Sequence, residues 1–461
     1  SEFLNTSSLP FNVKDYGAVG NGVADDTAAI QAAVDAAALV KGRVYAPASV
    51  YLTGQIVIKN GVWLYGDGKY STIFKLKSGT NTHVFKNYKA SGSEANAENW
   101  AITDCMIDGN KTVQSAGDGI YVEVSARTAS DTFNDSRWLI KNVFIFNTKD
   151  HGVETIPPRT SGGRIVNVDV FFCDGNGFRL TGADTKILGC ETGSTGLAGF
   201  YLNSSSCQID ACKSYFSGRI TAASGYGFQL NASFGCTISN SVAQDNSASG
   251  FRLENFSGRV ILSGCVSDSN STAGVGTYAG IDIADTNWAD VNMVCVERRS
   301  DGSNSYQRNA LLITGSTLNN KIKLTHSKIG SAVVDAPVHS SSTATAGNHI
   351  TINAQDGTQS ISYAASIVPD PYAGSTALIG SLTGAITVNA TTQQHTGQSL
   401  NFVFTQDSTG GRTIIFNSQY KTSWTPDLRP SMISVINFIY NGTNWIDTNY
   451  RSHPQNMLPA L

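Results

Sequence analysis

A short phrase recurs along the middle of the chain: glycine, an apolar residue, a variable residue and a second apolar residue. The copies read GIYVEV, GVETI, GFRLT, GFYLN, GFQLN, GFRLE and GIDIA, and they begin at Gly119, Gly152, Gly177, Gly199, Gly227, Gly250 and Gly280. Successive copies are 22 to 33 residues apart, and a degenerate ALLIT follows at Ala310. One such unit cannot bury its apolar residues alone, whereas stacked units can. The repeat therefore predicts an all-β chain built as a right-handed parallel β-helix.

Other features of the repeat agree with this architecture. Second apolar segments such as IVNVDVFF and VILSGCVS lie between the copies, and turn motifs rich in Asp, Asn and Gly follow them. A β-propeller is the alternative, but its period is longer, about 40 residues or more. The unequal spacing predicts loops of different length, as in a solenoid that displays a binding face. We expect the glycine of each phrase to make the turn and the apolar residues to fill the core.

Composition narrows the possible partners. Charged residues make up 15% of the chain and the formal net charge is −3, which argues against nucleic acid as a ligand. No apolar run is long enough to cross a membrane. Most of the eight cysteines fall inside apolar strand patterns, so we expect reduced, buried thiols, with disulfides as the alternative. The chain has no C-x-x-C pair, and we expect no metal site and no cofactor.

One helix is predicted near the start, within ADDTAAIQAAVDAAA. Asp25, Asp26 or Thr27 can cap its N-terminus, while Ile30 and Val34 begin an apolar stripe. A helix across the open end of a solenoid would protect unpaired strand edges. We therefore interpret Asp25 and Asp26 as capping residues, and a catalytic role for them is the alternative.

The opening of the chain resembles a known superfamily. The segment FNVKDYGAVGNGVADDTAAIQAAVDAA, followed by GRVYAPASVYLTGQIVI and GVWLYGDGKYSTIFK, is similar to the start of pectate-lyase-like β-helix proteins, an opening that recurs in bacteriophage tailspikes. The resemblance covers residues 11–77. It implies a homotrimer on the phage tail, attached through a missing N-terminal region, that cleaves O-antigen or capsule at the bacterial surface. Lyases, galacturonases and epimerases share this superfamily, so the resemblance leaves the reaction open.

We expect five segments along the chain. They are a cloning remnant or leader (1–10), an N-terminal cap with the first coils (11–80), the parallel β-helix (81–336), a Ser/Thr-rich junction (337–365) and a small C-terminal β-sandwich (366–461). Alternating strands and the turn signals STGGR and NGTN predict the last segment. It resembles C-terminal modules of phage tail proteins, which trimerise the spike or touch glycans. Trp424 and Trp445 are expected to pack in its core or at a subunit interface rather than against sugars.

The variable residue of each phrase is expected to point away from the core, because successive side chains of a strand face opposite sides. Stacking the coils then gives one column: Tyr121, Glu154, Arg179, Tyr201, Gln229, Arg252 and Asp282. A second column two residues along the strands reads Glu123, Ile156, Thr181, Asn203, Asn231, Glu254 and Ala284. Aromatic rings, amides and charges at such positions are typical of a polysaccharide-binding strip. A plain solvated face is the alternative.

Two carboxylate pairs on these columns suit hydrolysis of a glycosidic bond. That reaction needs carboxyl groups about 5–5.5 Å apart for retention, or about 6.5–9.5 Å apart for inversion. Glu254 and Asp282 lie on a diagonal between adjacent coils, ~8 Å between Cα atoms, and Glu123 and Glu154 form the same diagonal at the other end. Because two such pairs exist, we favour endo-hydrolysis over the alternatives.

Elimination at a uronic acid is one alternative. Arg179 could neutralise the sugar carboxylate and lower the pKa of Tyr201, which would act as the base. Glu154, Lys149 and His151 lie one coil away, and His151 is either a general base or a turn-capping residue. No acids occupy consecutive coils of the first column, which argues against calcium.

A glycan-binding adhesin without catalysis is the third possibility, and it would use the same strip. The residues expected to bind the sugar chain are Tyr121, Gln229, Arg252, Asn203, Asn231 and Lys149. A trimer could also place the site between subunits, with the loop SARTASDTFNDSRW as the foremost contributor.

Overall fold

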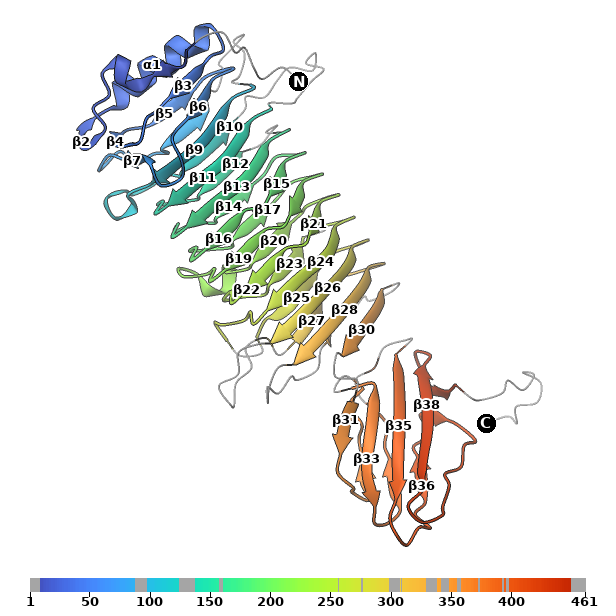
Figure 1. Ribbon diagram of the computed structural model, residues 1–461. Coiled ribbons are helices and arrows are strands. Elements are labelled where there is room, and N and C mark those ends of the chain that lie inside the picture. Colours follow the sequence, from blue (N-terminus) through green and yellow to red (C-terminus); the bar gives the residue numbers. More distant parts are fainter. Residues whose placement is uncertain are drawn as a thin grey trace, which may run out of the picture.

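The computed structural model of the chain describes residues 9–87, 98–123, 137–156, 161–255, 257–274, 277–297, 307, 309–328, 338–340, 348–354, 358–371, 374–391, 394 and 398–448. Figure 1 shows a long solenoid with helix α1 (Thr27–Leu39) at its N-terminal end and a separate group of strands beyond its C-terminal end. Within the described part of the chain, no helix has the length and apolarity needed to cross a membrane.

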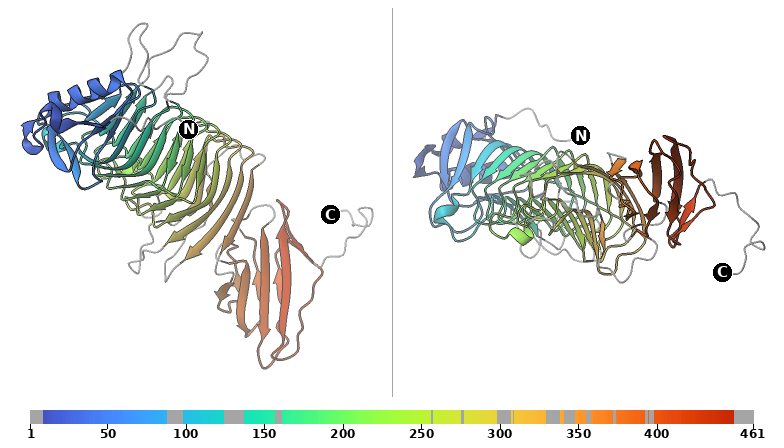
Figure 2. Two further views of the ribbon diagram at one scale, coloured as in Figure 1. Left: turned by 45° about the horizontal axis from the view of Figure 1, so that its top comes forward. Right: turned by 90° about the horizontal axis from the view of Figure 1, so that it is seen from below.

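Two parallel sheets form the solenoid, as the repeat predicts, and Figure 2 shows their coils stacked along one axis. The minor sheet has 11 strands. They are β5 (Ile56–Ile58), β8 (Phe85–Asn87), β10 (Ile120–Glu123), β12 (Val153–Ile156), β14 (Phe178–Leu180), β17 (Phe200–Leu202), β20 (Phe228–Asn231), β23 (Phe251–Glu254), β25 (Ala279–Ala284), β27 (Asn309–Thr314) and β29 (Val338–Ser340). The seven copies of the phrase lie on β10, β12, β14, β17, β20, β23 and β25, so this part of the minor sheet displays the predicted strip.

The major sheet has 19 strands. They are β1 (Phe11–Asn12), β2 (Asn21–Asp25), β3 (Arg43–Tyr45), β4 (Ser49–Thr53), β6 (Trp63–Tyr65), β7 (Thr72–Leu76), β9 (Ala101–Asp108), β11 (Leu139–Phe146), β13 (Arg164–Phe171), β15 (Lys186–Leu188), β16 (Glu191–Gly193), β18 (Gln208–Asp210), β19 (Lys213–Tyr215), β21 (Thr237–Ser239), β22 (Val242–Gln244), β24 (Ile261–Asp268), β26 (Asp290–Glu297), β28 (Lys321–Lys328) and β30 (His349–Ala354). The apolar segments between the phrases form these strands, which close each coil opposite the minor sheet.

The phenylalanines of the phrase form a ladder inside the solenoid. Phe178, Phe200, Phe228 and Phe251 stack with ring centroids 4.8, 4.7 and 5.0 Å apart, and their planes lie within 6° of parallel. Each ring is fully buried. Offset stacking of rings at this spacing adds to the free energy gained by burial. The repetition of Phe thus sets the coil-to-coil register of the minor sheet.

The glycine of each phrase is needed for a reason other than the expected turn. Gly177 and its equivalents are absent from the left-handed backbone conformations of the described residues. A Cβ at Gly177 would instead meet Thr192 Oγ1 at 2.2 Å and Gly199 O at 2.6 Å. The glycine is therefore required because the two sheets and the next coil approach the backbone too closely for a side chain.

Helix α1 packs against the first coils, and its buried residues are Ile30, Ala33, Val34 and Ala37. Asp26 is the N-cap residue, but its carboxylate accepts from the backbone of Val19 and Gly20 and makes no bond to the helix. Asp25 Oδ1 accepts from Thr27 N, the first helical residue, at 3.1 Å, and Asp25 Oδ2 pairs with Lys77 Nζ at 2.6 Å. Both aspartates therefore hold backbone structure, and Asp25 alone binds the helix N-terminus through its side chain.

The C-terminal strands form two sheets around one core. The larger contains β31 (Thr358–Ile361), β33 (Thr376–Leu382), β35 (Ser399–Gln406), β38 (Ile433–Tyr440), β39 (Trp445–Asp447) and β37 (Tyr420–Lys421), and the smaller contains β32 (Ser366–Ile367), β34 (Ile386–Val388) and β36 (Ile414–Phe416). Trp445 is fully buried in this core and Trp424 packs against it, so both tryptophans have the expected packing role. All eight cysteines are free and buried, as predicted.

Candidate functional site

The variable residues of the phrase line up in register on the minor sheet. Glu154 pairs with Arg179, Arg179 with Tyr201, and Arg252 with Asp282. The predicted outer column is therefore confirmed: Tyr121, Glu154, Arg179, Tyr201, Gln229, Arg252 and Asp282. Its accessibility is uneven, because Glu154 and Asp282 are buried whereas the other side chains are partly exposed.

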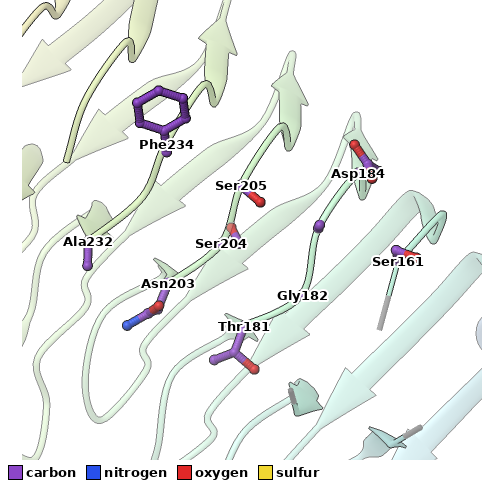
Figure 3. Close-up of a pocket in the computed structure, with 10 residues that line it drawn as sticks. Ser161, Thr181, Gly182, Asp184, Asn203, Ser204, Ser205, Ala232 and Phe234 are labelled. Atoms are coloured by element: carbon purple, nitrogen blue, oxygen red, sulfur yellow. The ribbon is translucent and has the colours of Figure 1, made fainter. Parts of the chain in front are cut away.

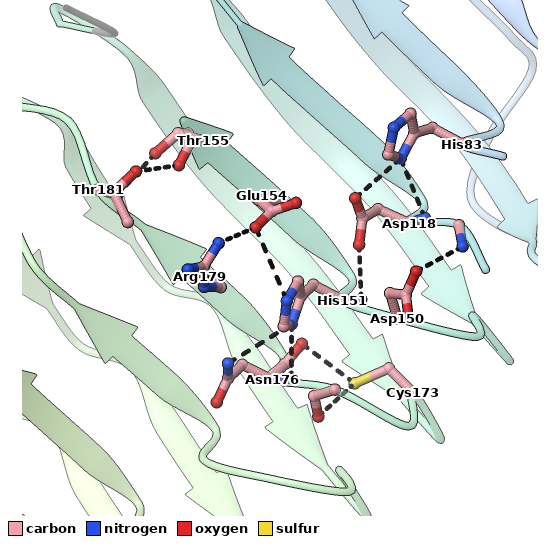
Figure 4. Close-up of polar contacts among 12 residues, drawn as sticks. His83, Asp118, Asp150, His151, Glu154, Thr155, Cys173, Asn176, Arg179 and Thr181 are labelled. Carbon is pink, nitrogen blue, oxygen red and sulfur yellow. Dashed lines mark hydrogen bonds and ion pairs between the residues drawn. The ribbon is translucent and has the colours of Figure 1, made fainter. Parts of the chain in front are cut away.

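An arginine–carboxylate pair lies at the N-terminal part of the column. Arg179 Nη1 donates to Glu154 Oε1, and His151 Nε2 lies 3.7 Å from the same oxygen (Figure 4). The Arg179 side chain is 35% exposed, whereas that of Glu154 is 10% exposed. The guanidinium is thus held by the Glu154 carboxylate on the adjacent coil while the Arg179 side chain stays partly exposed, which suits the binding of a substrate carboxylate.

The residue before the glycine of each phrase forms a hydrogen-bonded column beside the outer one. Asp118 Oδ1 accepts from His151 N at 2.7 Å, His151 Nδ1 accepts from Asn176 N at 2.9 Å, and Asn176 Oδ1 accepts from Ala198 N at 3.0 Å. Figure 4 shows Asp118, His151 and Asn176 following one another along the coils. Because Nδ1 accepts a backbone proton, the ring proton of neutral His151 must lie on Nε2.

Burial and neighbouring charges shift the pKa values of His151 and Glu154. Burial lowers the pKa of His151, so its neutral form is favoured. Burial raises the pKa of Glu154, and the negative charge of Asp118 adds to this effect, while His151 and Arg179 oppose it. The site therefore combines a neutral imidazole that donates from Nε2 with a fixed cation.

Aromatic residues border the pair on both sides. The Arg179 guanidinium lies 6.0 Å from the ring centroid of Tyr201, on the next coil. On the other side Tyr121 stacks on His83, with centroids 4.0 Å apart and planes 17° apart. Burial, Glu123 and Glu154 raise the pKa of Tyr121 to about 12. Tyr121 is therefore a neutral stacking group, whereas Tyr201 lies beside the open cation.

Neither predicted hydrolytic pair is free of a cation. Glu123 Oε2 lies 3.1 Å from Lys86 Nζ, and Glu154 is bound by Arg179. Glu254 Oε2 accepts from Arg252 Nε at 3.0 Å, while Arg252 Nη1 also binds Asp282.

The carboxylates at the C-terminal end are also closed off. Asp282 is only 2% exposed, and burial raises its pKa although Arg252 opposes the shift. Glu254 Oε1 accepts from Gln229 Nε2 at 2.7 Å. The Arg252 guanidinium lies 5.8 Å from the ring centroid of Tyr226, whose pKa burial raises to about 12. The single Arg252 guanidinium is thus shared between two carboxylates, in contrast to Arg179, which pairs with one.

Three cations surround one carboxylate on the flank that precedes the strands. Lys111 Nζ and Lys149 Nζ lie 2.8 and 3.1 Å from the Asp174 carboxylate, and Arg219 Nη2 lies 3.8 Å away. Burial alone would raise the pKa of Asp174, but hydrogen bonds from both lysines outweigh it and lower the pKa. Lys149 thus belongs to this flank and not to the outer column. We name Lys111, Lys149, Asp174 and Arg219 the basic cluster, and its excess of positive charge favours an anionic ligand.

The opposite flank, where the strands end, carries a pocket of about 380 Å³. Its lining is mostly hydroxyl and amide: Ser161, Thr181, Gly182, Ala183, Asp184, Asn203, Ser204, Ser205, Ala232 and Phe234 (Figure 3). Asn203 therefore faces a cavity as expected of a sugar-binding residue. Asn231 accepts instead from Asn255 Nδ2 at 3.1 Å.

Three groups near Arg179 could share a cation. Ligand atoms of Asp118, His151 and Glu154 lie within 4.8 Å of one another. Backbone N–H groups bind Asp118 Oδ1 and His151 Nδ1, Arg179 binds Glu154 Oε1, and His83 Nδ1 lies 2.8 Å from Asp118 Oδ2. Among the described contacts, His151 Nε2 and Glu154 Oε2 remain as atoms that could face a cation.

Sequence reasoning missed several residues of this site. Asp118, Asn176 and His83 form or border the column before the glycines, and that column could have been found by aligning the residue before each repeated glycine. Lys111 and Arg219 have no comparable signal, since they lie in connections of unequal length between strands, Lys111 at the start of the 3-10 helix Lys111–Val113. The loop SARTASDTFNDSRW, proposed to bridge subunits, lies outside the described residues except for its last two.

Two family models match the chain. Residues 10–218 match the model described as rhamnogalacturonase A/epimerase, pectate lyase-like, and residues 367–445 match the model described as a putative phage tail fibre C-terminal domain. Mannuronan C5-epimerase AlgE3 of Azotobacter vinelandii is 39% identical over 117 residues, which are 23% of this chain and 6% of that protein. Alginate lyase 7 of the same organism is 36% identical over 123 residues, 24% of this chain and 14% of that protein. The chain thus matches only a small part of the length of these relatives.

Solved structures share the fold. Tailspike protein 2 from Escherichia coli O157:H7 bacteriophage CAB120 aligns with a TM-score of 0.55 and 18% identity over 73% of this chain and 47% of that chain. The A-module of Azotobacter vinelandii mannuronan C-5 epimerase AlgE6 aligns with a TM-score of 0.52 and 18% identity over 74% of this chain and 99% of that chain. These likenesses confirm the parallel β-helix fold inferred from the repeat and from the opening residues.

Proposed function

We propose that this pectate-lyase-like β-helix protein acts on a uronate-containing polysaccharide of the bacterial surface by removing the proton α to the uronate carboxylate. The observation that carries the proposal is Arg179, a guanidinium anchored by Glu154 yet 35% exposed at its side chain. Removal of such a proton places negative charge on the substrate carboxylate, and a fixed cation stabilises that charge most effectively in a partly desolvated site. The basic cluster on the adjacent flank would attract the same polyanion.

Two groups beside Arg179 can assist the proton transfers. Tyr201, on one neighbouring coil, would accept the C5 proton of the uronate on its phenolate oxygen. His151, on the other side, carries its ring proton on Nε2 and would donate a hydrogen bond from it to O4. The C–H electron pair then forms the C4–C5 double bond while the C4–O4 bond breaks, and the phenol formed at Tyr201 transfers its proton to the leaving O4. The role of His151 follows from the tautomer that the contact of its Nδ1 with Asn176 N imposes.

Epimerisation at C5 is a second candidate, and the identity to mannuronan C5-epimerases favours it. Its first step is the same proton abstraction, but the carbanion is reprotonated on the opposite face instead of expelling O4. Groups on both sides of Arg179 suit either outcome. Hydrolysis by Glu254 and Asp282 remains the alternative, although both of these carboxylates bind Arg252.

The test is to incubate the protein with a panel of uronate-containing polysaccharides in D₂O. Elimination gives an ultraviolet-absorbing unsaturated end, epimerisation gives deuterium at C5 without cleavage, and hydrolysis gives new reducing ends with the C5 proton retained. Arg179→Lys is the matched variant, because it keeps the charge but loses the planar fork. Cleavage with an intact C5 proton, or full activity of Arg179→Ala, would contradict the proposal.

We further propose that the protein is a homotrimeric phage tail component. The match of residues 367–445 to a phage tail fibre model and the tailspike fold support this location. Light scattering of the full chain measures its mass, and a monomer at all concentrations would contradict the trimer. The polysaccharide panel would identify the particular sugar and, through it, the host.

A further inference from the structure

The turn that follows each outer strand repeats from coil to coil. Single bridges link the residues Ser161, Ala183, Ser205, Phe234, Gly258, Asn287 and Leu318 in successive coils. The next residue in each turn has a left-handed backbone: Gly162, Asp184, Ser206, Gly235, Arg259, Trp288 and Asn319. Gly and Asn are favoured in that conformation, whereas a bulky side chain is disfavoured. Arg259 (φ 52°) and Trp288 (φ 62°) are therefore exceptions.

Packing within the chain does not explain the exception at Trp288. Trp288 is 64% exposed, and its indole has no hydrogen-bond or ring partner in the described part of the chain. Phe234, two coils before it, is 51% exposed, and the Arg259 guanidinium lies 5.3 Å from its ring centroid. The left-handed backbone of Arg259 is therefore accompanied by a contact with Phe234, whereas that of Trp288 has no such compensation. Uncompensated backbone strain indicates a functional reason.

The hydroxyl-lined pocket includes Phe234, and Arg259 and Trp288 follow in the turns one and two coils beyond it. Phe234 forms one end of its lining, and Ser161, Asp184, Asn203 and Ser205 supply polar groups along it (Figure 3). Thr181 and Asn203 follow Arg179 and Tyr201 by two residues, so the pocket continues from the outer column. Trp288 lies four coils beyond Arg179, which corresponds to roughly 19 Å along the axis.

We propose that Phe234, Arg259 and Trp288, named the aromatic ledge, form with this pocket a glycan subsite that holds the polysaccharide away from the reacting sugar. Aromatic rings bind the C–H faces of sugars, while hydroxyl, amide and guanidinium groups bind their hydroxyls and carboxylates. The inference rests on the proposed function only in that the ligand is a polysaccharide. It assigns the ledge to binding and not to chemistry.

The chemistry of the surface favours a sugar chain over a second copy of this protein. The centre of a protein interface is depleted of charge and packs like a protein interior. Here a guanidinium lies against one of the two aromatic residues, and the adjoining pocket is lined mainly by hydroxyl and amide groups. A polysaccharide can satisfy these groups along its length.

The experiment measures binding of size-fractionated mannuronan oligomers to the full-length Arg179→Ala protein, so that turnover does not interfere. Trp288→Asn is the informative variant, because Asn319 occupies the equivalent position in the next coil. We expect it to keep or raise Tm, since Asn tolerates the left-handed backbone. We also expect about three- to tenfold weaker binding of oligomers longer than roughly 20 Å, with no change for shorter ones. Trp288→Phe should restore most of the affinity.

Phe234→Ala should weaken binding of oligomers longer than roughly 10 Å, because Phe234 lies two coils beyond Arg179. Tyr70→Ala, which removes an exposed aromatic that packs on Phe144 of the major sheet, should leave binding unchanged. Equal loss of affinity for short and long oligomers, no loss in either ledge variant, or no binding by the parent would overturn the proposal. A change of oligomeric mass in Trp288→Asn would assign the ledge to a subunit interface instead. If the wild-type protein leaves the C5 proton intact while the ledge variants still weaken long-oligomer binding, the proposed function fails and the ledge stands.

Discussion

Two arginine–carboxylate pairs lie on the same outer column, and their surroundings differ. Arg179 binds one carboxylate, that of Glu154, and keeps a 35% exposed side chain. Arg252 binds two, those of Glu254 and Asp282, and its side chain is 19% exposed over a 3% exposed Asp282 side chain. The first pair has a neutral imidazole beside it, and the second has the half-buried Tyr226. A cation with an unused face can act on a ligand, whereas a cation enclosed by two carboxylates stabilises the fold.

The largest expected effect is on stability at the enclosed pair. Arg252→Ala leaves two carboxylates without their cation, one of them nearly inaccessible, and Asp282 Oδ1 already has no hydrogen-bond partner among the described residues. Removing one partner of a buried ion pair costs about 3–5 kcal/mol. We expect urea unfolding to show a loss of this size. The triple variant Arg252→Met, Glu254→Gln, Asp282→Asn should recover most of the lost stability. A loss below about 1 kcal/mol in Arg252→Ala would contradict this prediction, because that is the contribution of an exposed ion pair.

Arg179→Ala should act on turnover rather than on folding. Loss of a group that stabilises transition-state charge lowers kcat about 10²–10³-fold. The unfolding free energy should fall by less than in Arg252→Ala, because the Arg179 side chain is the more exposed of the two. Steady-state kinetics with the polysaccharide identified by the panel measures this effect. A rise in KM at constant kcat would instead make Arg179 a binding residue only.

The pH dependence of stability should report on His151. Its folded-state pKa is lowered by burial, so the unfolded chain binds more protons below about pH 6.5, and stability falls as the pH drops through this value toward the folded pKa. Glu154, Asp150, Asp118, Arg179 and His83 surround the ring and are retained in the variant. His151→Gln should remove this slope, worth about 1.4 kcal/mol for each unit of pKa shift. An unchanged slope would show that another histidine is responsible.

The smallest effect is expected at the carboxylates of the enclosed pair. Glu254→Gln should change kcat/KM by less than about threefold, roughly 0.6 kcal/mol, because that carboxylate serves only to hold Arg252 and Gln229. Asp282→Asn should likewise retain activity in the folded fraction. Hydrolysis predicts the opposite, since each carboxylate would then be an acid, a base or a nucleophile. Loss of activity in both variants, with normal folding, would transfer the active site to this end of the column.

The pairing of residues along the outer column could be predicted from the periodicity of the sequence. A period of two within each strand and one phrase per coil place Glu154 beside Arg179 and Arg252 beside Asp282, and the register confirms both. The accessibility of these residues could not be anticipated. Every residue of β25 is buried, including Asp282 on its outer side, and local sequence carries no sign of this.

The groups beside the column were less predictable for a different reason. His151, Asp118 and Asn176 read as ordinary turn residues, and only the stacking of coils turns them into a chain of hydrogen bonds that fixes a tautomer. The basic cluster gathers Lys111, Lys149 and Arg219 from separate turns around Asp174, which itself reads as a turn former. Turn lengths vary between coils, so no sequence interval predicts these contacts.

The solenoid, its core ladder and the order of residues along the outer column can all be predicted from the amino-acid sequence, because each follows from local alternation repeated at every coil. Which charges pair with one another and which remain open to a ligand is seen only in the folded chain. That choice depends on burial and on distances of a few ångströms between residues separated by 25 to 63 positions in the chain, as in Arg179–Glu154 and Lys111–Asp174. Electrostatic interactions depend steeply on both quantities, whereas backbone periodicity depends on neither.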